Sequence, residues 1–272
     1  MQHPASLDPG EAYLSDTPLL RAHRGTQPDL YLCWNPIPSG AVAIDVIVHL
    51  HGFSRAGGGM PLSEKVATSG LDLAGRRRPT LAMLPRGNWL RYSWYDFPGL
   101  VAGGLDRLVE YGTAWLAARI CQPGLQVDRL LLSAHSGGGM PAVDAIAAAA
   151  RQPDEFFVFD GLYGRDPAGG NPMLGIETVD RWLAARLARE SERQGALRVL
   201  YIEQQTGAFS RRVAALIDRR LAAFDPGSAA ALASRYRVEP ALVPHAHIAR
   251  RCLPELLAAA DCDFDWSRAL PR

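Results

Sequence analysis

The chain reads LLLSAHSGGGM over residues 130–140, an apolar run that leads to a serine set among small residues. The run is typical of a buried β-strand, and the alanine-rich segment that follows Ser136 is typical of a helix. Ala134 and Gly138 suit a sharp turn, because a larger side chain at either position would meet the adjoining strand or helix. A strand–turn–helix of this kind exposes a serine hydroxyl, so we predict that Ser136 is a nucleophile.

Two other interpretations of this glycine-rich turn are open. A phosphate-binding loop would need Gly-Lys-Ser/Thr or G-x-G-x-x-G, and the sequence has neither pattern. The turn could also be purely structural. The nucleophile interpretation is favoured, because the turn would lie at the sheet edge where α/β folds bind ligands, with the start of a helix directed at the same spot.

The rest of the chain alternates between strand-like and helix-like segments. The strongest strand, AVAIDVIVHL at 41–50, is apolar almost throughout, as expected for burial on both faces of a parallel sheet. Further strands are predicted at 30–34, 80–84, 127–132, 156–159, 197–202 and 236–238, with helices at 106–120, 140–150, 179–187, 209–221 and 255–260. Pro254 fits the first turn of the final helix. This alternation predicts an α/β fold with a doubly wound, mostly parallel sheet and helices on both faces.

Length and composition set the broad class. A chain of 272 residues with 48% hydrophobic residues fits one globular domain, expected at 41–272, with residues 1–40 as a lead-in packed on it. The net charge of +1 favours neither nucleic acid nor an anionic membrane as a partner. A run of arginines at 76–78 is expected to be solvated surface.

Targeting and redox signals are weak. The sequence shows no signal-peptide core and no apolar run that could span a bilayer, so a cytoplasmic location is expected. The four cysteines form no C-x-x-C pair and are expected to be reduced thiols. The composition does not distinguish a monomer from an oligomer.

His51-Gly52-Phe53 follows the strong strand directly and is the candidate oxyanion-binding segment. Acyl transfer passes through a tetrahedral oxyanion that fixed N–H donors stabilise. We expect those donors to be the backbone N–H of Gly137 and an N–H at Phe53 or Gly52. An ordinary turn at the end of a strand is the alternative.

With these features the chain resembles the α/β-hydrolase superfamily over roughly residues 41–260. The resemblance is carried by His51-Gly52 after a strand, by AHSGG at 134–138, and by a late histidine before the last helix. One departure is Ala134, which stands where the G-x-S-x-G motif usually begins with glycine. The resemblance implies the α/β-hydrolase fold and a triad of serine, histidine and an acidic residue.

The expected general base is His245, with His247 as the alternative. Both lie in VPHAHI at 243–248, where the resemblance implies the catalytic histidine, and imidazole has a pKa suited to neutral pH. Some similar hydrolases carry a histidine three residues before an isoleucine and upstream of a proline-leucine-leucine run. His245 keeps that spacing, and it is therefore preferred.

The acid is either Asp160, after the strand at 156–159, or Glu203, after the next strand. The superfamily usually places the acid on the later strand, although enzymes with the acid on the earlier one are known. Asp160 is preferred because Gly161-Leu162-Tyr163-Gly164 forms a tight apolar turn that could bury and orient it. Glu203 is followed by polar residues, and a solvated strand end is its alternative role.

A long loop at 85–104 is rich in aromatic residues, and long loops are often functional. Trp89, Trp94 and Tyr95 are therefore candidates to line a substrate pocket, with packing over the sheet edge as the alternative. Together these features predict a serine hydrolase that cleaves a small-molecule ester, or an amide, through an acyl-enzyme. No metal or cofactor is implied. An acyltransferase or serine peptidase on the same triad and a non-catalytic binding module are the alternatives.

Overall fold

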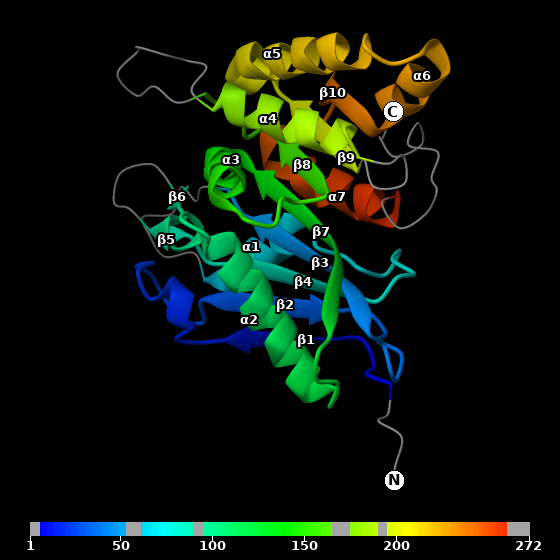
Figure 1. The fold of residues 1–272 in the computed structure, drawn as a ribbon. Coiled ribbons are helices and arrows are strands. Elements are labelled where there is room, and N and C mark those ends of the chain that lie inside the picture. The colour runs from blue at the N-terminus through cyan, green and yellow to red at the C-terminus, as the bar shows by residue number, and fades with distance from the viewer. Residues whose placement is uncertain (1–5, 53–60, 90–94, 165–174, 190–194, 260–272) are drawn as a thin grey trace.

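The computed structural model describes residues 6–52, 61–89, 95–164, 175–189 and 195–259. One eight-stranded sheet runs through the molecule in the order β1-β2-β4-β3-β7-β8-β9-β10, as Figure 1 shows. Its strands are β1 (Gly10–Leu14), β2 (Leu30–Trp34), β3 (Ala43–Leu50), β4 (Thr80–Pro85), β7 (Gln126–His135), β8 (Glu155–Phe159), β9 (Ala196–Tyr201) and β10 (Tyr236–Pro240). A separate two-stranded ribbon joins β5 (Asn88–Trp89) to β6 (Tyr95–Asp96).

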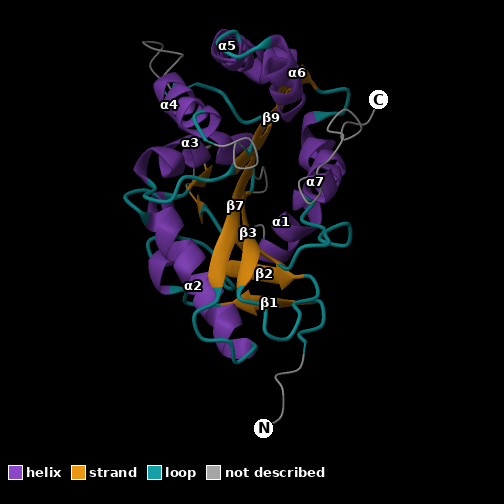
Figure 2. Cartoon of the chain, turned by 45° about the vertical axis from the view of Figure 1, so that its right-hand side comes forward, coloured by secondary structure: helices purple, strands orange, loops and turns teal. Residues whose placement is uncertain are grey.

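The eight-stranded sheet is parallel from β4 to β10, and the pairings of β2 with β1 and with β4 are antiparallel. The helices are α1 (Leu62–Ser69), α2 (Gly104–Arg119), α3 (Gly139–Ala148), α4 (Ile176–Leu187), α5 (Glu203–Leu221), α6 (Pro226–Arg235) and α7 (Ile248–Ala259). Figure 2 shows α1 and α7 on one side of the sheet and α2, α3 and α4 on the other. The predicted doubly wound, mostly parallel α/β sheet with helices on both faces is therefore confirmed.

Two apolar cores, one on each face, hold the sheet between its helices. Along β7, Leu130 and Leu132 pack in the core under α2 and α3, whereas Leu131 packs in the core under α1 and α7. Successive strand side chains point to opposite faces, so a strand covered on both sides is mostly apolar on both. This explains why the central strands are hydrophobic over most of their length.

The element boundaries differ from the sequence prediction in informative places. The final helix begins at Ile248 rather than at 255, so Pro254 lies inside α7 and not in its first turn. Burial of an apolar stripe that includes Ile248 and Leu253 outweighs the backbone hydrogen bond that a proline removes. The strand β1 and the helices α1 and α6 were not predicted. Within 1–40, both β1 and β2 join the main sheet.

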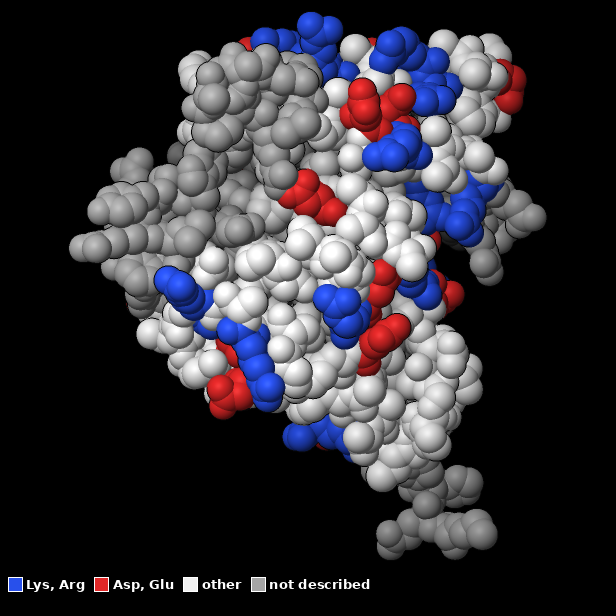
Figure 3. Space-filling model, turned by 60° about the vertical axis from the view of Figure 1, so that its left-hand side comes forward, with Lys and Arg blue, Asp and Glu red and all other residues white. Residues whose placement is uncertain are grey.

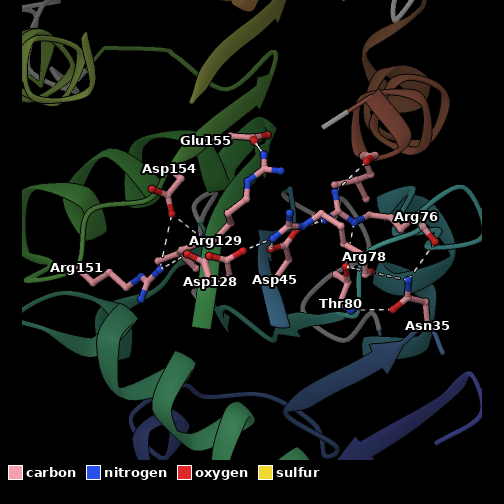
Figure 4. A network of polar contacts seen from close by, with 12 residues as sticks. Asn35, Asp45, Arg76, Arg78, Thr80, Asp128, Arg129, Arg151, Asp154 and Glu155 are labelled. Atoms are coloured by element: carbon pink, nitrogen blue, oxygen red, sulfur yellow. Dashed lines mark hydrogen bonds and ion pairs between the residues drawn. The ribbon is translucent and has the colours of Figure 1, made fainter. Parts of the chain in front are cut away.

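The amino ends of the central strands carry a network of ion pairs, shown in Figure 4. Asp45 at the start of β3 is buried and pairs with Arg76 and Arg78, and Arg78 also pairs with Asp128 on β7. The guanidinium of Arg76 further donates to the carbonyl of Leu257 at 3.0 Å. The expectation that the 76–78 run is solvated surface was therefore wrong for Arg76, because its guanidinium pairs with the buried carboxylate of Asp45.

The surface carries charges of both signs. On the face seen in Figure 3, lysines and arginines alternate with aspartates and glutamates in small groups. No helix within the described residues is both long enough and apolar enough to cross a membrane. The described cysteines are free thiols: Cys33 and Cys252 are buried and Cys121 is exposed.

Candidate active site

Ser136 stands at the turn between β7 and α3 in a strained backbone conformation. Its φ is +49°, a left-handed value that non-glycine residues rarely adopt and that is common at functional sites. The turn needs its glycines: a Cβ on Gly138 would lie 2.4 Å from the carbonyl oxygen of Leu50, and one on Gly139 would lie 2.1 Å from that of Gly161. The sharp turn predicted from the sequence is thus enforced by the neighbouring strand ends.

His245 lies between Ser136 and Asp160. Its Nε2 is 2.9 Å from Ser136 Oγ, and its Nδ1 is 2.5 Å from Asp160 Oδ2. His245 lies in the 3₁₀ turn at His245–His247, directly before α7. It is 109 positions along the chain from Ser136. The His245 side chain is 29% exposed and that of Asp160 is fully buried, so the acid is shielded while the base can reach a substrate.

Asp160 is held by groups from the next strand and helix. Its Oδ1 accepts the backbone N–H of Ile202 at 2.9 Å and the hydroxyl of Thr206 at 2.5 Å. Hydrogen bonds to a buried carboxylate offset the loss of water around its charge. Sequence reasoning missed Thr206, because only the tertiary structure brings the first turn of α5 over the end of β8.

The two alternative residues lie outside this group. Glu203 opens α5 and is exposed, and its carboxylate pairs with Arg211. His247 is exposed, and its backbone N–H donates to the carbonyl of Pro244 at 2.9 Å. The structure therefore brings Ser136, His245 and Asp160 together and leaves Glu203 and His247 apart from them.

Gly52 passes close beside the serine. A Cβ at Gly52 would lie 2.8 Å from Ser136 Cβ, so no larger residue fits without displacing the elbow. The carbonyl oxygen of Gly52 accepts a hydrogen bond from the ammonium of Lys65 at 2.8 Å. Burial lowers the pKa of this lysine to about 8. Gly137 lies in the turn after the serine. Phe53, the other expected oxyanion donor, lies outside the described residues.

Three further histidines surround the elbow, and burial keeps them neutral. Burial lowers the pKa of His49 to about 3 and that of His135 to about 4, and it also lowers the pKa of His51 well below its usual value. His135 Nε2 donates to the carbonyl of His245 at 3.0 Å and so supports the loop that carries the base. His51 Nε2 accepts the N–H of Gly87 at 2.9 Å. Because its Nε2 is an acceptor, His51 Nδ1 carries the proton, and it donates to the carbonyl of Gly52 at 2.9 Å.

The segment directly after Asp160 places one more side chain beside Ser136. The hydroxyl of Tyr163 is 3.3 Å from Ser136 Oγ and 3.5 Å from Gln205 Oε1. From the sequence, residues 161–164 are expected only to form an apolar turn that orients Asp160. A tyrosine three residues after the predicted acid was the one available signal, and it did not indicate where the ring would point.

The predicted aromatic pocket stays a prediction. The backbones of Trp89 and Tyr95 pair with each other in the β5–β6 ribbon, their side chains are not described, and Trp94 lies outside the described residues. Within the described ranges, no three histidine, cysteine, aspartate or glutamate side chains form a group that could hold a metal ion. The groups gathered around Ser136 are those of acid–base and nucleophilic chemistry.

Comparison with known proteins found solved structures that align with this chain, but no protein-family model and no curated protein sequence matches it. A ferulic acid esterase aligns with a TM-score of 0.47 and 12% identity, covering 94% of this chain and 98% of the esterase. The siderophore hydrolase EstB from Aspergillus nidulans aligns with a TM-score of 0.47 and 13% identity, covering 97% of this chain and 96% of the hydrolase.

Carboxyl esterase 2 from the fungus Tuber melanosporum aligns with a TM-score of 0.44 and 15% identity, covering 89% of this chain and 83% of the esterase. At such identities the likeness concerns the course of the backbone, not the substrate. The chemistry of this chain is therefore inferred from its own side chains.

Proposed function

We propose that this protein is a serine hydrolase that cleaves small-molecule carboxylic esters through an acyl-enzyme. The proposal rests on one observation: His245 joins Ser136 Oγ, at 2.9 Å, to the buried carboxylate of Asp160, at 2.5 Å. A hydroxyl, an imidazole and a buried carboxylate in this order are the parts that activate a serine.

The hydrogen bonds assign the protons. The carboxylate of Asp160 accepts, so His245 Nδ1 carries a proton and Nε2 is free to accept the proton of Ser136. As Ser136 Oγ attacks the ester carbonyl, its proton passes to His245 Nε2. Asp160 stabilises the imidazolium that forms and keeps its own charge. His245 then protonates the leaving alcohol, and water, deprotonated by the same nitrogen, hydrolyses the acyl-enzyme.

The oxyanion is assigned to the backbone beside the serine. Gly52 packs against Ser136 Cβ, and Gly137 follows the serine in the turn before α3. We assign the backbone N–H of Gly137 and an N–H at Gly52 or Phe53 as the donors. One such donor contributes about 3 kcal/mol of transition-state stabilisation in enzymes that cleave acyl bonds. The start of α3 adds the positive end of its dipole.

The direct test is covalent labelling of Ser136 by a fluorophosphonate, located by peptide mass spectrometry. We expect one labelled site, which disappears in Ser136→Ala and persists in Ser133→Ala, a variant of a buried serine in the preceding strand β7. p-Nitrophenyl acetate should give a burst of one nitrophenolate per enzyme. Labelling that survives in Ser136→Ala would refute the assignment.

The acyl acceptor can be tested with the same enzyme. If water is the acceptor, adding a primary alcohol to the p-nitrophenyl acetate reaction should leave acetate as the main product. A product dominated by the acetylated alcohol would instead identify an acyltransferase with the same nucleophile.

A further inference from the structure

The segment 160–163, directly after β8, carries Tyr163 as well as Asp160 and packs closely against the turn at Ser136. A Cβ on Gly161 would lie 2.8 Å from the carbonyl oxygen of Ser136, and the side chain of Leu162 is only 1% exposed. The Tyr163 ring is half-buried, with its hydroxyl 3.3 Å from Ser136 Oγ. This close packing places a phenol beside an oxygen that makes and breaks bonds in the proposed reaction.

The direction of this hydrogen bond follows from the triad. The proton of Ser136 is directed to His245 Nε2, so the serine oxygen must accept from Tyr163, which donates. Tyr163 has one proton and a second acceptor nearby, Gln205 Oε1 at 3.5 Å. A charged acceptor binds a donor more strongly than a neutral one, so charge on Ser136 Oγ draws the proton of Tyr163 toward the serine.

Within the proposed serine-hydrolase function, we propose that Tyr163 is a catalytic residue of deacylation that donates a hydrogen bond to Ser136 Oγ as this oxygen leaves. Water attacks the acyl carbon while His245 takes its proton, and the tetrahedral intermediate then collapses. The bond between the acyl carbon and Ser136 Oγ breaks, His245 returns the proton to Oγ, and Tyr163 keeps its own proton throughout.

The contribution differs between the two half-reactions. In the acyl-enzyme, Ser136 Oγ is an ester oxygen and a weak acceptor, but it gains charge as it leaves, so the bond from Tyr163 is stronger in the transition state. In acylation, Oγ already accepts this bond as a hydroxyl before it attacks, so the bond strengthens less between the ground state and the transition state than it does in deacylation. Only an interaction that strengthens in the transition state speeds a step. Burial, with the nearby Asp160 charge, raises the pKa of Tyr163, which keeps it a donor through neutral and mildly alkaline pH.

The test is Tyr163→Phe with p-nitrophenyl acetate in pre-steady-state and steady-state measurements. We expect the post-burst rate, and with it kcat, to fall about 10- to 100-fold, the range for one hydrogen bond to a charged group. KM should fall by the same factor, because acyl-enzyme accumulates, while kcat/KM stays within about twofold. Loss of the acetyl group from Ser136, followed by intact mass after a single turnover, should slow by the same factor as kcat.

Tyr13→Phe, on the edge strand β1, is the matched control and should change neither constant. A fall in kcat/KM equal to the fall in kcat would place the effect of Tyr163 on acylation as well and overturn the proposal, as would an unchanged post-burst rate. A wild-type enzyme with neither a burst nor labelling of Ser136 would overturn the proposed function itself, and the role of Tyr163 with it.

Discussion

Strands β3, β7 and β8 carry charged or polar groups at both ends, and the two ends differ in what those groups can do. At the amino ends, Asp45 and Glu155 meet arginines from distant parts of the chain. At the carboxyl ends, Asp160 meets the imidazole of His245, which meets Ser136. Both ends bury carboxylates, so burial alone does not distinguish a structural network from a site of chemistry.

The partner of the carboxylate makes the difference. A guanidinium keeps its proton at any pH where proteins are folded, so an arginine beside Asp45 can hold the sheet together but cannot transfer a proton. An imidazole exchanges its proton near neutral pH. The same buried charge therefore stabilises the fold at one end and orients a base at the other.

The largest effect is expected from Asp160→Asn, at the carboxyl ends of the strands. The amide would favour the wrong imidazole tautomer of His245, and kcat should fall about 10⁴-fold, as loss of the acid does in serine proteases. Glu203→Gln should keep kcat within about twofold, since Glu203 pairs with Arg211 on the surface of α5. The measurement is kcat with an activated ester. Full activity in Asp160→Asn with loss in Glu203→Gln would reverse the assignment of the acid.

At the amino ends of the strands, Asp45→Asn should lower the free energy of unfolding by about 3–5 kcal/mol, because Arg76 would stay buried beside a neutral partner. Urea unfolding measures this loss, and kcat per folded molecule should not change. Asp128→Asn is the control, because its pair with Arg78 is 41–48% exposed and should contribute no more than about 1 kcal/mol. A loss of kcat in folded Asp45→Asn would show that the two ends are not independent.

A third variant, Gly52→Ala, tests how closely the residues at the carboxyl ends of the strands are packed. The added methyl would meet Ser136 Cβ at 2.8 Å and His135 Nδ1 at 3.0 Å, and the serine or the oxyanion segment must shift. A displacement of this size should lower kcat by up to about 10²-fold with a smaller effect on stability. Gly227→Ala in α6 is the control with no expected loss of kcat. Equal kcat in both variants would argue against an oxyanion role for this segment.

The smallest effect is the dependence of folding stability on pH that arises from the buried histidine His49. Unfolded histidine takes up a proton near its ordinary pKa of about 6.5. The pKa of His49 is about 3 in the folded protein, so folded His49 stays neutral well below that pH. Stability from this residue is therefore complete above about pH 6.5 and is lost as the pH falls toward its folded pKa, by about 2 kcal/mol at pH 5.

Urea unfolding at pH 5 and pH 7.5 measures this loss of stability, and His49→Gln should reduce the difference. His135, with a pKa of about 4, should add a similar contribution. An identical difference between the two pH values in His49→Gln and in the wild type would contradict the lowered pKa.

Much of this arrangement was predictable from the residues alone. The apolar run before Ser136 and the glycines after it predict a strand and a sharp turn, because unbroken hydrophobic runs and small residues have few other uses in an α/β domain. The order of the elements predicts that the serine, the acid and the late histidine reach the same sheet edge, since parallel strands end there together.

Other features were decided by tertiary structure. The bonds from Ile202 and Thr206 to Asp160, and the burial of Arg76 against Asp45, join segments that are distant in sequence. The contact of Tyr163 with Ser136 depends on how one loop is clamped against another. Periodicity records which face of an element is buried, but a hydrogen bond between distant side chains depends on positions accurate to a fraction of an ångström, and only the packed chain determines those.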